Sequence, residues 1–212
     1  MTGTTWDILL LGGASGVGKS RVAAQLADEA EAFVVEFDDV VSAVEAMTTA
    51  DGHPALHHFD DIADTAQLAT EQVLNLQIAT AGALEPAVLG VVRNRLTVDV
   101  PAVIEGDYLT PAAAAAAIQE GRAAGRRVRA VFLHEGDADR IAANYACREP
   151  GSGEQRHRAR VSAEYSRWLS DQASLHALPV VACRPWGTLA ARIGRVLGAE
   201  RDRYGLLEVP GA

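Results

Sequence analysis

A glycine-rich segment near the N-terminus holds the residues whose chemistry is clearest. Residues 13–20 read GASGVGKS and satisfy the pattern GxxxxGK[ST]. Glycines let backbone N–H groups turn inward around phosphate oxygens, and a helix that starts there adds the positive end of its dipole. Lys19 would then reach the β- and γ-phosphates, and the Ser20 hydroxyl would bind Mg²⁺. The motif predicts a site for the triphosphate of a purine nucleotide. The residues expected to bind the nucleotide here are Gly13, Ala14, Ser15, Gly16, Val17, Gly18, Lys19 and Ser20.

The lysine of this motif is the only lysine in the chain. The other 18 of the 19 Lys and Arg residues are arginines. A coding bias toward arginine explains the scarcity. Under that bias, the one lysine that remains indicates a position where arginine cannot replace lysine. That position lies in the phosphate loop.

Two acids follow the expected strand 33–37. Asp38, at the strand end on the phosphate-loop side, is predicted to orient or deprotonate an attacking hydroxyl or to help bind the metal. Asp39 is a candidate substrate contact, and the alternative of capping the helix expected over 40–47 suits it better. A cap is also the alternative for Asp38.

A second acidic strand end occurs in the sequence VIEGDY over 103–108. An apolar strand that ends in an acid resembles a Walker B motif, whose carboxylate holds Mg²⁺ or polarises the nucleophile. Glu105 is the preferred metal ligand, because it lies nearest the strand end. Asp107 is a candidate substrate contact, with turn formation as its alternative.

Arginines surround a segment rich in Gly, Pro and Ser, CREPGSGEQ over 147–155. The composition predicts a mobile lid, here taken as 147–160, and an arginine brought in by its closure would stabilise the transferring phosphoryl group. Arg148, at the hinge, is the first candidate, ahead of Arg156 and Arg160. Solvated helix positions are the alternative for most of the group, which comprises Arg140, Arg148, Arg156, Arg158 and Arg160.

Three further groups are weaker candidates. Arg184 and Trp186 follow a predicted strand and could stack on the adenine, although Trp186 fits a plain core or surface position equally well. Charges on a helix expected over 85–96 could contact the substrate or form a solvated face: Glu85, Arg93 and Arg95. A cluster of His53, His57, His58, Asp60 and Asp61 has no metal-ligand spacing, so solvated residues or substrate contacts are favoured over a metal site.

The elements needed to position these residues alternate along the chain. Short apolar runs predict strands over 7–11, 33–37, 102–105, 128–134 and 179–182, buried on both faces of a parallel sheet. Helical patterns cover 19–30, 111–124, 138–146, 156–175 and 188–197. The alternation predicts a doubly wound three-layer α/β domain with right-handed crossovers. Residues 40–100 are expected to form a helical insert for the substrate, with helices over 40–47, 62–80 and 85–96 and a loop over 48–60.

Bulk properties limit the classes of function. A chain of 212 residues suits one domain, and its net charge of −9 disfavours nucleic acids and anionic membranes as partners. Cys147 and Cys183 give no disulfide framework. The N-terminal residues have no basic region typical of a signal peptide, so a cytoplasmic monomer or homodimer is expected. The tail over 199–212 is expected to be loosely ordered.

The segments GGASGVGKS, VIEGDYLTP and DRIAANYACREPGSGEQRHR, with the acidic pair after the second strand, together resemble P-loop small-molecule kinases related to nucleoside monophosphate kinases. Within that group the first two segments look like 2-phosphoglycerate kinase, and the acid after the second strand is similar to that of chloramphenicol phosphotransferase. The resemblance covers residues 6–198, although only the phosphate loop is highly specific. It implies a P-loop NTPase fold with strand order 2-3-1-4-5, ATP and Mg²⁺ as cofactors, a lid arginine on the phosphates and a hydroxyl acceptor in the insert.

A nucleotide-dependent switch or AAA-type ATPase without a small-molecule acceptor is the alternative from another class. The chain has no NKxD motif for guanine, and switches rarely carry an arginine-rich lid of their own. A third reading, a toxin-like kinase of nucleotide-sugar acceptors, shares the catalytic residues and differs only in the insert. The sequence favours a kinase that phosphorylates a hydroxyl of a metabolite or natural product.

Overall fold

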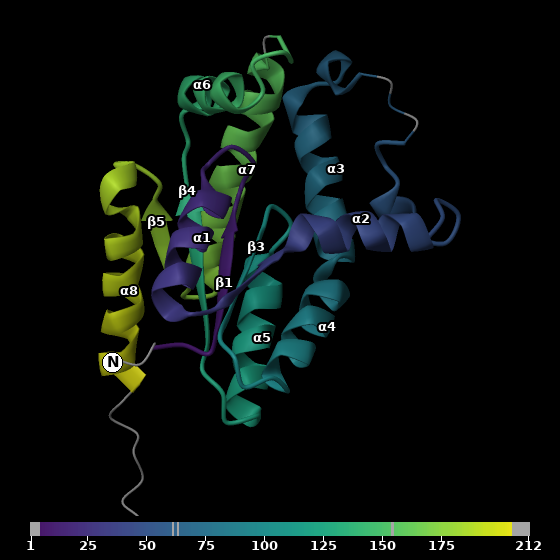
Figure 1. Cartoon of the computed structure of the whole chain (residues 1–212). Helices are drawn as coiled ribbons and strands as arrows, with labels where there is room; N and C mark the ends of the chain where they lie inside the picture. Colours follow the sequence, from purple (N-terminus) through teal and green to yellow (C-terminus); the bar gives the residue numbers. More distant parts are fainter. Residues whose placement is uncertain (1–4, 61, 63, 154, 205–212) are drawn as a thin grey trace, which may run out of the picture.

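A parallel sheet of five strands forms the middle layer of the molecule (Figure 1). The computed structural model describes residues 5–60, 62, 64–153 and 155–204. The strands are β1 (Ile8–Gly13), β2 (Phe33–Glu36), β3 (Ala102–Gly106), β4 (Val128–His134) and β5 (Val180–Ala182), in the order β2-β3-β1-β4-β5. This confirms the predicted order and the α/β fold class.

Helices cover both faces of the sheet and give the three layers (Figure 1). On one face, α1 (Lys19–Ala30) packs on β1, β2 and β3, and α8 (Leu189–Tyr204) packs on β5 and α1. On the other face lie α4 (Glu85–Leu96), α5 (Pro111–Ala123) and α7 (Arg156–Leu175). Two helices complete the upper part of the molecule: α3 (Thr70–Ala83), which packs on α7, and α6 (Ala138–Arg148). α2 (Phe37–Met47) follows β2 directly.

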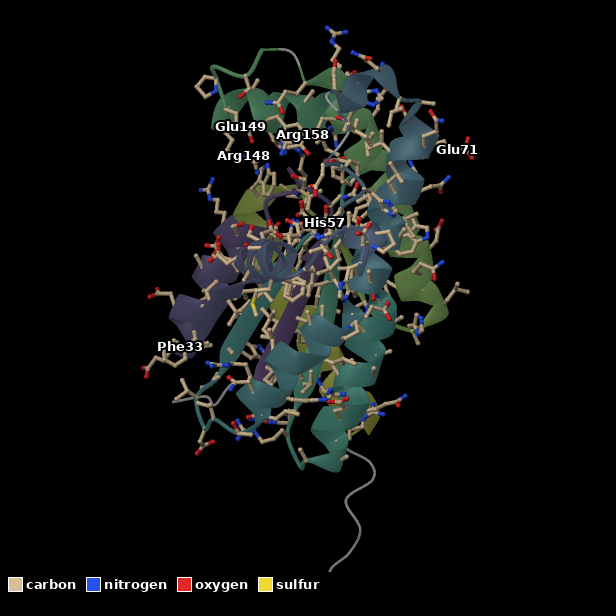
Figure 2. All side chains as sticks on the ribbon, turned by 90° about the vertical axis from the view of Figure 1, so that its right-hand side faces the viewer. Phe33, His57, Glu71, Arg148, Glu149 and Arg158 are labelled. Carbon is tan, nitrogen blue, oxygen red and sulfur yellow. The ribbon has the colours of Figure 1, made fainter. Side chains whose placement is uncertain are left out.

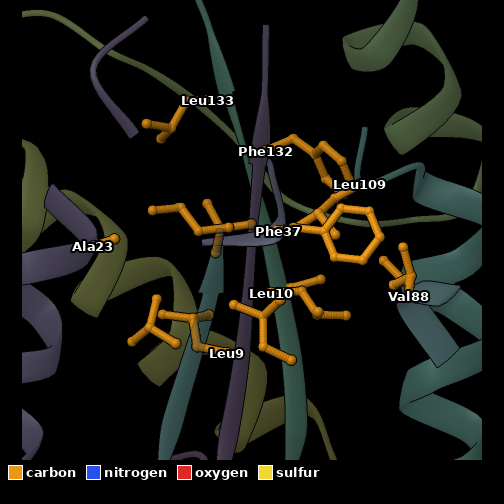
Figure 3. Close-up of a cluster of buried hydrophobic side chains, with 14 of the residues drawn as sticks. Leu9, Leu10, Ala23, Phe37, Val88, Leu109, Phe132 and Leu133 are labelled. Carbon is orange, nitrogen blue, oxygen red and sulfur yellow. The ribbon is translucent and has the colours of Figure 1, made fainter. Parts of the chain in front are cut away.

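The core lies between these layers and is built on the central strands (Figure 3). Every residue of β1 and of β3 is buried, as continuous apolar strands in the middle of a parallel sheet should be. Leu10 of β1, Phe132 of β4 and Phe37 at the start of α2 are each at most 1% exposed. The two parallel pairings of β1 bring Gly12 level with Gly106 and with Phe132, so the polar residues after these strands emerge at one edge.

The second strand differs from its prediction in burial and in length. β2 is an edge strand, and Phe33 and Val34 are 55% and 41% exposed, because no strand pairs with its outer side. Its last residue is Glu36, and Phe37 already belongs to α2. Asp39 is therefore not the helix cap, since Glu36 occupies the cap position and both aspartates lie in the first turn. Acids in a first turn complement the helix dipole, which explains the early start.

Other boundaries in the predicted insert and tail also shift. The helix expected over 62–80 starts later, because α3 begins only at Thr70. The described residues just before it contain a short 3₁₀ turn, Thr65–Gln67. A 3₁₀ turn at Pro54–Leu56 interrupts the predicted loop. α8 continues to Tyr204, so the first part of the predicted tail is helical, as its run of Glu and Arg favours. The remainder of the tail, 205–212, lies outside the described residues.

Among the helices that the structure describes, none is by itself long and apolar enough to cross a membrane. The bent pair Thr70–Ala83 and Glu85–Leu96 reaches the required length and composition only when the two helices are taken together.

We expect Leu10→Ala to lower the free energy of unfolding by about 2–5 kcal/mol, because the truncation leaves a cavity in the fully packed centre of the sheet. The same substitution at Leu175, which is 78% exposed at the end of α7, is the matched control and should cost less than about 1 kcal/mol. Urea unfolding of both variants measures the difference. Equal losses would contradict the assignment of Leu10 to the core.

Candidate active site

The phosphate loop connects β1 to α1 and forms one wall of a cavity of about 510 Å³. Gly18, the last loop residue, has φ of +89°, and an added Cβ there would lie 1.9 Å from the ring of Trp186. Only glycine fits this position, which lets the chain turn from the loop into the helix beside the indole. Gly16 also has a positive φ, of +77°. The loop thus has the backbone conformation that a phosphate cradle requires.

The cavity is lined by the phosphate loop, the end of β3, the start of α2, the hairpin of α6 and α7, and Trp186. Its lining residues are Ser15, Gly16, Gly18, Lys19, Ser20, Arg21, Asp38, Glu105, Asp107, Asn144, Tyr145, Cys147, Arg148, Arg158 and Trp186.

Lys19 lies at the bottom of this cavity with 6% of its side chain exposed. Its Nζ donates to the backbone oxygen of Ala14 at 3.1 Å and forms an ion pair with the carboxylate of Asp107. Burial by itself would lower the pKa of Lys19, but the charge of Asp107 outweighs it, with help from Glu105 and Asp38, and the pKa is raised. The ammonium therefore stays charged in the cavity.

Glu105 and Ser20 lie together beside the lysine. Glu105 is only 4% exposed at the end of β3, and it lines the cavity together with Ser20. Burial raises the pKa of Glu105, while Ser20 and Lys19 oppose the shift. A hydroxyl and a carboxylate oxygen side by side are the hard donors that Mg²⁺ prefers.

Asp38 reaches the same cavity from the first turn of α2. Gly106 makes this approach possible: an added Cβ there would lie 2.8 Å from Cβ of Phe37 and 3.6 Å from Oδ1 of Asp38. Partial desolvation at the cavity wall raises the pKa of Asp38, and the charge of Asp107 raises it further, against the opposing charge of Lys19.

Two arginines complete the cavity from the hairpin of α6 and α7. Arg148 and Arg158 both bind Glu149, at 2.5 Å and 3.0 Å, and their guanidinium groups lie 5.4 Å and 4.3 Å from the ring centre of Tyr145. The three charged side chains gather at one end of the molecule (Figure 2). The hydrogen bonds from Arg148 and then Gln155 lower the pKa of Glu149 to about 2, so it stays ionised.

The hairpin that carries these arginines has its own small hydrophobic core and is hydrogen-bonded to the phosphate loop. Tyr145 and Ile141 are fully buried against Ala159 and Ala163, and the Tyr145 hydroxyl lies 2.8 Å from Oγ of Ser162. Asn144 donates to the backbone oxygen of Gly16 at 2.8 Å. Cys147 and Arg148 belong to α6, so only residues 149–155 form the connection that the sequence placed at 147–155. A basic residue in the last turn complements the helix dipole, which favours this later end.

The sequence-predicted residues fall into two sets. Lys19, Ser20, Asp38, Glu105, Asp107, Arg148 and Trp186 line the cavity, together with Ser15, Gly16 and Gly18. Gly13, Ala14 and Val17 of the loop are buried and do not line the cavity. Outside the lining lie Asp39, Glu85, Arg93 and Arg184.

Each residue outside the lining has another contact or an exposed position. Arg93 of α4 pairs with Glu120 of α5 at 2.6 Å, and Glu85 accepts the hydroxyl of Thr110 at 2.6 Å. Arg184 donates to Asn144 and lies 3.5 Å from Glu135 and 5.3 Å from the ring of Trp186. Asp39 is exposed in the first turn of α2. Of the other lid arginines, Arg156 and Arg160 are exposed and outside the lining.

Of the histidine cluster, His57 bonds Oγ1 of Thr48 at 3.0 Å and Oδ2 of Asp60 at 2.7 Å. Asp61 lies outside the described residues. Within the described residues no group of three or more His, Cys, Asp or Glu side chains has a metal-binding arrangement.

Five residues that line the cavity were not predicted as site residues: Arg21, Asn144, Tyr145, Cys147 and Arg158. Helical spacing carried part of the signal. Asn144 and Tyr145 precede Arg148 by four and three residues, which places all three on one side of α6. Arg158 was one of the lid arginines, but the sequence could not show that it lines the cavity, because its position depends on how α7 crosses α6.

Residues 8–170 match the family model described as an AAA domain, AAA_33. The chain belongs to this family. Among curated proteins, no sequence match to the AAA_33 chain was found.

Solved structures resemble this AAA_33 protein over nearly its whole length. A gluconokinase from Sinorhizobium meliloti 1021 has a TM-score of 0.61 at 14% identity, and the match covers 98% of this chain and 99% of that one. A shikimate kinase from Acinetobacter baumannii in complex with shikimate has a TM-score of 0.51 at 13% identity, covering 93% and 96%. At these identities the likeness establishes a shared fold, that of the P-loop kinases.

The raised pKa of Asp38 gives a prediction for stability. Because the folded-state pKa lies above the unfolded value, the ionised carboxylate destabilises the fold at neutral pH, and this cost disappears as pH falls through the folded pKa and then the unfolded one. We expect Asp38→Asn to melt at a higher temperature than the parent at pH 7, by an amount that narrows toward pH 4. Asp39→Asn removes an acid from the same helical turn and is the control; it should give no gain. A melting temperature for Asp38→Asn at or below that of Asp39→Asn at pH 7 would contradict this account.

Proposed function

We propose that the protein is an ATP-dependent phosphotransferase that phosphorylates a hydroxyl of a small molecule, either a metabolite or a natural product. The observation that carries the proposal is the surroundings of Lys19: a buried ammonium, the only lysine of the chain, between a glycine loop and three carboxylates in one cavity. Phosphoryl transfer needs cations placed for the donor and acids placed for metal and acceptor. The P-loop kinase fold supports the same reading.

Mg²⁺ fits the pair formed by Ser20 and Glu105. Both residues line the cavity beside Lys19, and Glu105 is buried with a raised pKa, which a divalent cation would reverse. When bound, the ion would neutralise charge on the β- and γ-phosphates. We assign Ser20 and Glu105 as its protein ligands, with Asp38 as an alternative ligand.

The chemistry assigned to the chain itself is positioning and proton transfer. The acceptor oxygen attacks the γ-phosphorus, the bond from that phosphorus to the bridging oxygen breaks, and ADP leaves with the electron pair. The hydroxyl proton passes to the carboxylate of Asp38, whose raised pKa makes it a better base than an ordinary aspartate. Lys19 stabilises the charge on the transferring group.

Arg148 and Arg158 are assigned to the donor phosphates. Both are held by Glu149 at the side of the cavity, and both stack on Tyr145. A nucleotide triphosphate would attract them from Glu149, since its charge is larger and their guanidinium groups can bind two oxygens at once. Closure of 147–160 over the nucleotide is part of this proposal. Trp186, beside Gly18, is assigned to the adenine, and residues 40–100 to the acceptor.

The alternative is an ATPase without an acceptor, as the name of the AAA domain family would suit. Solved kinases cover nearly the whole chain in the structural comparison, which favours the kinase reading. Steady ATP hydrolysis separates the two functions: a kinase should be almost silent until an acceptor is added. Robust hydrolysis that no small molecule alters would refute the proposed function. A cytoplasmic location and a monomeric or dimeric state remain part of the proposal.

Lys19→Ala is expected to abolish transfer, because loss of charge at the transferring group removes several kcal/mol of transition-state stabilisation, on the order of 10²–10³-fold in rate or more. Lys19→Arg should restore little of it, since the buried space around Nζ is closed by Ala14 and Asp107. Arg195→Ala, at an exposed position of α8 outside the cavity lining, is the control and should keep parental activity. Activity retained in Lys19→Ala, measured as ADP release with an acceptor, would exclude the assigned role.

Asp38→Asn should lower kcat by at least ~10²-fold, because the acceptor hydroxyl loses its base. The affinity for ATP should stay within a few-fold of the parent, as measured by calorimetric titration. A comparable loss of ATP and Mg²⁺ affinity would instead make Asp38 a metal ligand.

A further inference from the structure

Charge is strongly segregated along the chain. Between Arg21 and Arg93 all thirteen charged residues are acidic. The net charge of −9 therefore divides into −13 for this segment and +4 for the rest of the chain. The segment contains α2, α3 and most of the region assigned to the acceptor.

The same division runs across the cavity. Its four cations, Lys19, Arg21, Arg148 and Arg158, come from the phosphate loop and from the hairpin of α6 and α7. Of the carboxylates, Asp38 comes from the first turn of α2, Glu105 from the end of β3, and Asp107 from the residues that follow β3. All four cations thus lie on the elements assigned to the donor. The lining residues from α2 and from the end of β3 and just after it are all acidic. An anionic acceptor would face carboxylates without a compensating charge.

Asp107 becomes the key residue once the nucleotide is bound. Its side chain is 19% exposed and its only ion pair among the described residues is with Lys19. When the triphosphate draws Lys19 away, Asp107 cannot follow, because its backbone oxygen accepts the Tyr165 hydroxyl at 3.1 Å. A partly buried carboxylate is then left without a partner, and such a group needs a cation or strong donors.

The surroundings of Asp107 add further negative charge. The pKa of the neighbouring Tyr108 phenol is raised by burial and then by the charges of Asp107, Glu45 and Asp38. The negative charges of Asp107, Glu45 and Asp38 therefore all act on the phenol of Tyr108.

We propose that the acceptor is a small hydroxylated compound that carries a protonated amine, and that Asp107 binds this ammonium while Asp38 faces the hydroxyl. The inference rests on the proposed function and narrows its substrate class. Acids and phosphate esters are the compounds that this site rejects.

The test uses the full chain with ATP and Mg²⁺ and measures ADP release for acceptors in matched charge triplets. The first triplet is D-glucamine, D-glucitol and D-gluconate, which share a hexitol chain and differ at C1; aminocyclitols, cyclitols and cyclitol carboxylates such as shikimate form the next. Within any triplet that is turned over, kcat/KM should be highest for the amine and at least ~10-fold lower for the carboxylate, the ratio that corresponds to about 1.4 kcal/mol.

A variant separates the role of Asp107 from a general loss of activity. Asp107→Asn should reduce the preference for the amine over the neutral compound to about one, whatever happens to the overall rate. Glu71→Gln removes an acid of the same segment that points away from the cavity (Figure 2), and it should leave the preference unchanged.

The outcomes are distinct. A carboxylate or neutral compound that is the best member of its triplet, or an amine preference that survives in Asp107→Asn, would overturn this inference and leave the kinase function standing. Failure of every triplet to release ADP would overturn this inference, whereas the proposed function stands or falls on the ATP hydrolysis assay described above.

Discussion

The ion pair between Lys19 and Asp107 is the interaction on which the arrangement of the site depends. A buried ammonium is costly unless it is paired, and here the phosphate loop, the end of β3 and the start of α2 all contribute to its stabilisation. The parallel register of β1 and β3 brings the loop and the two acids of β3 to the same edge of the sheet. Gly106 then lets α2 approach closely enough for Asp38 to join them.

The pair also explains why the site can serve a polyphosphate in an acidic chain. Positive charge is confined to the loop and to the hairpin of α6 and α7, where Glu149 holds two arginines at the cavity edge. A triphosphate can replace Asp107 and Glu149 as the partner of these cations, so Lys19, Arg148 and Arg158 are already paired before a nucleotide binds. Burial raises the pKa of Asp38 and of Glu105, and the charges of neighbouring acids raise both further.

Much of the fold and part of the candidate site could be predicted from the sequence, because motifs and hydrophobic periodicity are local features of the chain. The phosphate loop and the bounds of α1, α4, β4 and α7 follow from a motif and from hydrophobic periodicity, and the strand order follows from the family resemblance. The residues of β2 gave no sign of its exposure, since an edge strand of Phe and Val reads like a buried one; only the strand order, which places β2 at the edge, indicated it. The pairing of Lys19 with Asp107, 88 residues apart, depends on the register between β1 and β3, and the place of Arg158 depends on a helix crossing. Arg93 looked available for a substrate, but it binds a neighbouring helix.

A crystal structure of the protein with Mg²⁺ and a non-hydrolysable ATP analogue tests the central claim most directly. The account predicts that Nζ of Lys19 leaves Asp107 and lies within hydrogen-bond distance of the β- and γ-phosphate oxygens, with the phosphates enclosed by residues 13–20. A complex in which Lys19 keeps its contact with Asp107, or in which the phosphates lie outside that loop, would contradict it.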